Sequence, residues 1–285
     1  MNEDASRNIP VCRLECTASR EEKLIFMELL MIKDNSDVTW ERFGKENAYY
    51  GVLGHEKYRR EMLDEKAKLE FFETGYDHVN HVLEVATRHY GKLDAGKTAL
   101  DFGCGVARLV IPLAQQFVHV TGIDVSLSML NEARANCAAQ GIENVSFVES
   151  NDELSRVLGQ YDFVHSYIVL QHIPVKRGER IVERLLERLK PGGIIALHVP
   201  FMRKASVLRR SINLVRKYFT PLSIMVNVVQ GNKWDEPFMQ MNSYDVNQIL
   251  RILLIHEMQD VFIELIDTGG YMQAFCFAKK PYSVQ

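Results

Sequence analysis

The sequence predicts an α/β fold with a doubly wound, mostly parallel sheet of seven strands. An apolar strand runs into a glycine-rich turn and a helix at residues 98–110, and a second strand ends in an aspartate at residues 120–126. Helical segments separate most of the strands, as parallel pairing requires, and a short turn at residues 268–270 makes the last strand antiparallel. The expected strands are residues 98–102, 119–124, 145–149, 161–166, 193–199, 260–266 and 272–279.

The turn in residues 98–110, TALDFGCGVARLV, is typical of nucleotide-binding folds. Gly103 and Gly105 allow the backbone to bend sharply and let a ligand approach where a Cβ atom would clash. Ala107 follows Gly105 by two positions, which gives a Gly-x-Gly-x-Ala turn. Taken alone, the same glycines are compatible with a tight turn that binds nothing.

Asp124 ends the second strand and lies 23 positions after Asp101. In a strand–helix–strand unit this position places a carboxylate at the tip of the neighbouring strand, where it can accept both hydroxyls of a ribose. The alternative role for Asp124 is an ordinary helix N-cap.

Five segments in order resemble the class I S-adenosylmethionine-dependent methyltransferases. They are LDFGCGVARL, GIDVS, SFVESND, YDFVHSYIVLQHIP and LKPGGIIALHV, between about residues 95 and 200. The resemblance implies a Rossmann-like fold and S-adenosylmethionine as cofactor. In that family an acidic residue two before the first glycine, here Asp101, holds the amino end of the cofactor's methionine, directly or through water.

The resemblance also implies the other cofactor contacts. Asn151 or, preferably, Asp152 would bind the adenine amine, although both are also common helix caps. Ser166 and Tyr167 would line the methionine and ribose. The full set expected to bind the cofactor is Asp101, Gly103, Gly105, Arg108, Asp124, Val125, Met129, Asn151, Asp152, Ser166, Tyr167 and Gln171.

Histidines are the candidate catalytic bases. His172 follows the fourth strand and leads, with His198 and His55 as weaker candidates. A base is needed only where the acceptor must lose a proton, and histidine titrates in the useful range. For each of the three, a role as a satisfied structural side chain competes with catalysis.

Two segments are expected to enclose the site. Residues 1–80 form an N-terminal tail and helical cap, and residues 81–285 form the methyltransferase domain, with a lid inserted at 200–242. Cap and lid aromatics would cover the sulfonium by cation–π contact, or else only pack on the core. These aromatics are Tyr49, Tyr50, Tyr58 and Trp234.

The lid is basic. Residues 201–236 hold seven basic and two acidic side chains in a chain of net charge −3. They form either a solvated amphipathic helix or a surface for an anionic or lipid-linked acceptor or a membrane. The basic side chains flanking the apolar face are Arg209, Arg210, Arg216 and Lys217.

Composition argues against several other classes of protein. The net charge gives no reason to expect nucleic acid. Five cysteines, of which only Cys12 and Cys16 are close in sequence, predict neither a disulfide framework nor a metal site. No signal peptide or spanning segment is expected, which predicts a cytoplasmic protein. The oligomeric state is not predicted.

The sequence therefore predicts a methyltransferase that moves a methyl group from S-adenosylmethionine to a small-molecule, lipid or sugar-type acceptor, with oxygen as the preferred atom. An NAD-type oxidoreductase shares the glycine turn and Asp124, but it predicts neither Asp101 nor the final hairpin. A non-catalytic S-adenosylmethionine-binding protein is the second alternative.

Overall fold

A computed structural model of the chain describes residues 36–93, 96–204, 220–229, 233–268 and 270–282. Cys12, Cys16 and the four basic residues of the predicted lid helix lie outside these ranges.

The seven predicted strands form one sheet in the order β3-β2-β1-β4-β5-β7-β6. β1 to β5 pair in parallel, and β7 lies antiparallel between β5 and β6, so the predicted fold class is confirmed. The fifth strand is much longer than expected and extends toward the predicted lid. The strands are β1 Thr98–Phe102, β2 His119–Asp124, β3 Val145–Glu149, β4 Tyr161–Ser166, β5 Leu189–Arg203, β6 Gln259–Asp267 and β7 Tyr271–Lys279.

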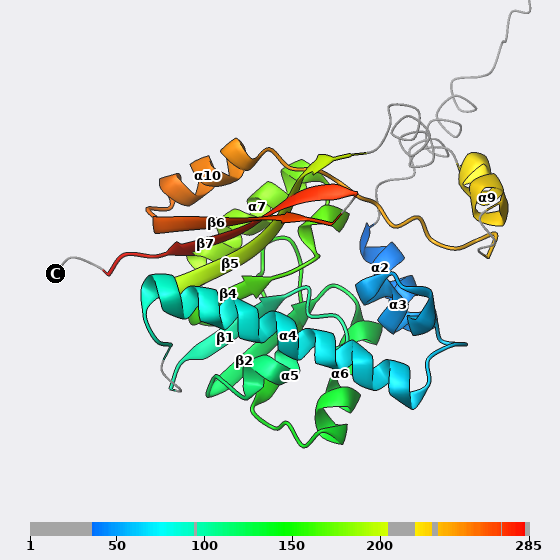
Figure 1. Cartoon of the computed structure of the whole chain (residues 1–285), viewed down its shortest axis with the longest axis horizontal. Helices are drawn as coiled ribbons and strands as arrows, with labels where there is room; N and C mark the ends of the chain where they lie inside the picture. The colour runs from blue at the N-terminus through cyan, green and yellow to red at the C-terminus, as the bar shows by residue number, and fades with distance from the viewer. Residues whose placement is uncertain (1–35, 94–95, 205–219, 230–232, 269, 283–285) are drawn as a thin grey trace, which may run out of the picture. The chain divides into compact units, whose positions relative to one another are not determined.

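Helices bury both faces of the sheet, as a doubly wound fold requires. One hydrophobic cluster joins the sheet to α4, α5 and α6, and a second joins it to α7 and α10. Figure 1 shows α4 crossing one face of the sheet. The helices are α4 Glu65–Tyr90, α5 Val110–Ala114, α6 Leu127–Ala139, α7 Val175–Glu187 and α10 Val246–Ile255.

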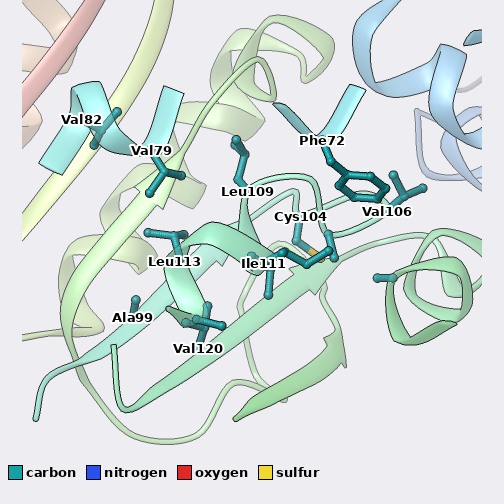
Figure 2. Packing of buried hydrophobic residues seen from close by; sticks show 14 of the residues in the cluster. Phe72, Val79, Val82, Ala99, Cys104, Val106, Leu109, Ile111, Leu113 and Val120 are labelled. Carbon is teal, nitrogen blue, oxygen red and sulfur yellow. The ribbon is translucent and has the colours of Figure 1, made fainter. Parts of the chain in front are cut away.

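The α4 helix is longer than the predicted helix over residues 80–90. The Asp64 side chain accepts a hydrogen bond from the Ala67 N–H and caps the start of the helix, and Gly91 ends it. Val79 and Val82 lie among the buried residues that pack around the glycine turn and α5 (Figure 2). The predicted boundary at 80/81 falls inside α4, so the chain has no break there.

The described part of the predicted cap begins at Ser36 and contains three short helices before α4. It contains α2 Ser36–Glu46, α3 Ala48–Leu53 and the short helix η1 Glu56–Tyr58. Glu41 of α2 accepts hydrogen bonds from Ser126 Oγ, Ser128 N and Ser128 Oγ at the start of α6. Burial alone would raise the pKa of Glu41, but these hydrogen bonds outweigh it and lower the pKa to about 2. A partly buried carboxylate at the N-terminus of α6 thus fixes α2 to the sheet domain.

The described part of the lid holds one helix, α9 Thr220–Val229. The lid's final residues return to the sheet edge, where the Asn242 N–H donates to the Gln171 carbonyl oxygen at 2.6 Å. The Tyr244 hydroxyl donates to the carbonyl oxygens of Leu170 and Ile173. No helix among the described residues is long and apolar enough to span a membrane.

Candidate functional site

A cavity opens at the carboxyl ends of β1, β2 and β4, the edge where open α/β sheets bind ligands. It holds about 860 Å³ of empty space, including its open mouth. Floor residues come from the glycine turn and strand tips, and α2 and α3 contribute to the wall. Of the predicted cofactor residues, the cavity is lined by Gly103, Gly105, Arg108, Asp124, Val125, Met129, Asn151, Asp152 and Tyr167.

The glycine turn brings backbone directly to the cavity. Gly103 has a φ of +73°, and a Cβ atom added to it would lie 2.3 Å from Cγ2 of Val169. Ala107 also has a positive φ, +70°, which costs a non-glycine residue about 1–2 kcal/mol. The turn therefore keeps a left-handed backbone at Ala107, although this residue is not glycine.

Asp124 is fixed at the rim by two backbone donors. The Gly105 N–H donates to Oδ2 at 3.0 Å, and the Ser126 N–H donates to Oδ1 at 2.9 Å. Ser126, not Asp124, caps α6, because its Oγ accepts from the Met129 N–H. Burial raises the pKa of Asp124 to about 6. Asp124 thus lines the cavity in a fixed orientation, and the N-cap alternative is wrong.

Asp101 lies one layer behind the cavity wall. Its side chain is buried, and its neighbours Phe102 and Gly103 line the cavity instead. Oδ1 accepts a hydrogen bond from Nδ1 of His165 at 2.8 Å. Oδ2 is buried and has no hydrogen-bond partner among the described residues.

Arg108 places a buried cation in the cavity. It is 3% exposed, and its Nη1 donates to Thr74 Oγ1 at 3.2 Å, while Nε has no hydrogen-bond partner among the described residues. Burial lowers the pKa of Arg108 to about 10, so the guanidinium stays charged at neutral pH. A buried guanidinium with open donor positions is suited to an anionic group of a ligand.

The predicted adenine end holds an ion cluster. Arg177 of α7 donates from Nε to both oxygens of Asp152 at 2.7 Å, and from Nη2 to Asp37 of the cap at 2.7 Å. Asn151 accepts from the Ser155 N–H. No helix follows these residues, so they are not helix caps. Asp152 faces the cavity while held by Arg177, and Asp37 joins the cap to this end of the site.

The three candidate histidines differ in their position relative to the cavity. His172 lines the cavity, where Trp40 packs edge-on against its ring. His198 is buried outside the lining, with Nδ1 accepting from the Ile168 N–H. His55 is exposed and caps η1 by accepting from the Lys57 N–H.

His172 is held as a neutral ring. Nδ1 donates to the carbonyl oxygen of Gln240 in the lid at 2.7 Å, so the lone pair lies on Nε2, where the Gln171 amide contacts it at 3.0 Å. Burial lowers the pKa of His172 to about 4. The ring is therefore unprotonated across the neutral range.

The predicted aromatic cover differs from the one observed. Tyr49 packs on α6, with its hydroxyl donating to Glu132 at 2.7 Å, and Tyr58 packs against Phe71. Tyr50 lies under the guanidinium of Arg59. Trp234 is 64% exposed. None of these four aromatics lines the cavity, because the three cap tyrosines pack on other helices or on Arg59, and Trp234 of the lid is exposed to solvent.

Sequence reasoning missed the residues that form the cap side of the cavity. These are Trp40, Val52, Ser36 and Asp37, with Arg177 opposite them. None belongs to a local motif. Conversely, Ser166 and Gln171 are buried beside the cavity but do not line it.

The described residues contain no cluster of three metal-ligating side chains, and Cys104, Cys137 and Cys276 are buried free thiols.

Residues 99–193 match a family model described as a methyltransferase domain. This segment holds the glycine turn, Asp124 and the β4 edge. Residues 99–193 thus match a methyltransferase domain, and they carry the segments that resemble the class I S-adenosylmethionine-dependent methyltransferases. The cavity described above lies at the sheet edge that carries these matched segments.

Two curated relatives are similar to this methyltransferase domain. A trans-aconitate 2-methyltransferase of Deinococcus radiodurans is 35% identical over 103 residues, 35% of this chain and 37% of the relative. A ubiquinone biosynthesis O-methyltransferase of Erwinia tasmaniensis is 35% identical over 100 residues, 34% of this chain and 40% of the relative. The matched segments thus span about two fifths of these relatives.

A solved structure shares the fold. Magnesium protoporphyrin IX methyltransferase of Synechocystis PCC 6803, with bound SAH, has a TM-score of 0.52 and 21% identity. The alignment covers 82% of this chain and 97% of that one.

Proposed function

We propose that the protein transfers a methyl group from S-adenosylmethionine to a small-molecule acceptor, with an acceptor oxygen as the preferred atom. The observation that carries the proposal is Asp124, held by two backbone N–H groups on the rim of the cavity that the glycine turn shapes. The match of residues 99–193 to a methyltransferase-domain model and the relatives named for methyl transfer support the same activity.

The residues present fit the cofactor in charge and shape. Asp124 would accept the ribose hydroxyls, and the glycine turn leaves room for close approach. Arg108 would bind the carboxylate, and Asp101, with an unpartnered oxygen, would attract the ammonium, directly or through water. Val125 and Asn151 line the region expected to hold adenine.

The chemistry needs alignment more than a strong catalyst. When bound, S-adenosylmethionine supplies an activated methyl, so the acceptor forms a new bond to that carbon as the carbon–sulfur bond breaks, leaving a neutral thioether. The protein's part is to exclude water and hold the acceptor in line. Trp40 and Val52 of the cap and Tyr167 of the β4 edge form walls suited to this task.

His172 is the proposed base for a hydroxyl acceptor. Its Nε2 lone pair would take the acceptor's proton, and the Gln240 carbonyl would stabilise the Nδ1–H of the imidazolium that forms. The Gln171 amide nitrogen donates a hydrogen bond to this Nε2, so the acceptor hydroxyl must displace the amide. His55 and His198, outside the cavity lining, do not share this position.

We further propose that the lid contributes to binding an anionic or lipid-linked acceptor, or a membrane surface. Met225, Val228 and Val229 of α9 are exposed apolar side chains, and Trp234 follows them. Apolar side chains beside a basic segment are typical of interfacial binding. Sedimentation with anionic vesicles tests this: V229D/W234S should reduce binding, and unchanged binding would contradict it.

The activity is tested with cofactor labelled in its methyl group and a panel of hydroxyl, carboxylate and amine acceptors. Label should move to at least one acceptor, and an oxygen nucleophile should serve best. Binding of the demethylated cofactor without transfer to any acceptor would favour the non-catalytic alternative. Protection against heat by NADH and not by S-adenosylmethionine would favour the oxidoreductase.

A further inference from the structure

Three titratable side chains form a buried line behind the cavity. His165 of β4 contacts Asp101 of β1 through Nδ1 at 2.8 Å and His78 of α4 through Nε2 at 3.1 Å. His165 is 0% exposed and Asp101 is 1% exposed. The His78 ring stacks on Tyr167, a cavity-lining residue, with 3.7 Å between ring centroids.

The hydrogen bonds determine where the protons lie. In the arrangement where Asp101 only accepts and His165 carries one proton, that proton lies on Nδ1 and the lone pair on Nε2. His78 must then donate from its own Nε2. Burial, with neighbouring His165 and Arg108, lowers the pKa of His78 far below its usual range, which keeps that ring neutral.

This arrangement uses one oxygen of Asp101 and leaves the other open. Oδ1 is occupied by His165, while buried Oδ2 has no hydrogen-bond partner among the described residues. An unsatisfied buried carboxylate oxygen is costly unless a ligand's donor or a bound water satisfies it. The strand register gives the same pairing, because Asp101 lies directly beside His165 in the sheet.

We infer that His165 is a positioning residue, which holds Asp101 so that its unpartnered Oδ2 is available to the ammonium group of the ligand, directly or through water, and that His78 fixes the tautomer of His165. This inference rests on the proposed function, since the ammonium belongs to the proposed cofactor. It predicts that the line of side chains controls selectivity for an amine-bearing ligand and not cavity binding in general.

Substituting His165 by Asn or by Gln tests the roles of its two ring nitrogens separately. In H165N the amide replaces Nδ1 and still donates to Asp101, whereas in H165Q it reaches the place of Nε2 and loses that contact. H165F removes both contacts. His119→Asn is the matched control, because His119 is a partly buried strand histidine that contacts Ser146 and does not line the cavity.

The experiment measures binding of S-adenosylhomocysteine and of its analogue lacking the amino group, by calorimetry on the full chain. Wild type, H119N and H165N should prefer the amine-bearing compound by about 10-fold or more, the scale of one charge-assisted hydrogen bond. H165Q and H165F should lose most of that preference, while the analogue binds each variant within about 3-fold of wild type. His78→Phe keeps a ring on Tyr167 but removes the donor, and should lose part of the preference.

The ratio of the two affinities within one variant is independent of how much protein is folded. If H165F does not fold, the comparison of H165N with H165Q decides. Retained preference in H165Q would overturn the positioning role while leaving the proposed function intact. Wild type that binds neither compound would overturn the proposed function and this inference together.

Discussion

The floor and the roof of the cavity are built in different ways. The floor is the glycine turn and the tips of β1 and β2, where backbone N–H groups hold Asp124. The roof is the cap, attached through side-chain contacts such as those of Glu41 with Ser126 and Ser128. The floor is fixed by the local backbone and the roof by contacts between distant residues, so the two should respond differently to substitution.

The largest effect is expected at the floor from Gly103→Ala. The new Cβ would lie 2.3 Å from Val169 in a residue with φ of +73°. Strain and overpacking together should lower the free energy of unfolding by about 2–4 kcal/mol and abolish measurable cofactor binding. Denaturant titration and calorimetry measure both.

Gly54→Ala is the matched control, because Gly54 has φ of +63° and open space around its Cβ position. It should lose only about 1 kcal/mol and bind cofactor normally. Equal effects in the two variants would show that the close approach at Gly103 is unimportant.

The next largest effect is on catalysis, at His172, where Trp40 of the roof packs against a residue that follows β4. His172→Asn removes the proposed base and should lower kcat for a hydroxyl acceptor by about 10²–10⁴-fold with little change in cofactor affinity. Single-turnover kinetics measure the transfer step. A variant with unchanged kcat would assign proton removal to another group or to water.

Asp124→Asn tests the charge at the rim. We expect the affinity for S-adenosylhomocysteine to fall by about 10–100-fold, as for loss of charge-assisted hydrogen bonds. The raised pKa, about 6, means that ionised Asp124 destabilises the unliganded fold, so its stability should fall as pH rises from about 4 to 6. The Asn variant should lack this fall in stability between about pH 4 and 6 while binding less ligand.

The same titration predicts the pH dependence of binding. Wild-type affinity should rise between pH 5 and 7 with a midpoint near 6, and this rise should be absent in Asp124→Asn. Because burial lowers the pKa of His172 to about 4, that histidine should not contribute to the rise. A rise that persists in the Asn variant would contradict the assignment to Asp124.

The contrast also explains what the sequence could predict. Gly103, Gly105 and Asp124 were found because a turn and a strand tip are local patterns, and pairing of parallel strands then brings them together. Trp40 and Arg177 were missed because they meet the cavity only when α2 and α7 are packed. Aromatic content suggested a cap, but composition does not say which ring points toward the cavity.

The smallest expected effect is at the roof. Glu41→Gln weakens the attachment of α2 to α6 and should lower the free energy of unfolding by about 1–2 kcal/mol and cofactor affinity a few-fold. Since hydrogen bonds overcome burial to lower the pKa of Glu41 to about 2, its stabilisation is present at neutral pH and lost as pH falls from about 4.5 toward 2. Thermal unfolding across this range measures it.

Glu46→Gln is the control for the roof, because Glu46 makes a partly exposed ion pair with Arg42 of the same helix and, among the described residues, no hydrogen bond to α6. Its effect should stay below about 0.5 kcal/mol. If both variants behave alike, the Glu41 contacts do not hold the cap.

Calorimetric titration of the full chain with S-adenosylhomocysteine tests the central claim most directly. Wild type should bind one equivalent, Gly54→Ala should bind equally well, and Gly103→Ala should show no binding. Absence of binding by wild type, or NADH binding as tightly at the same site, would contradict the account.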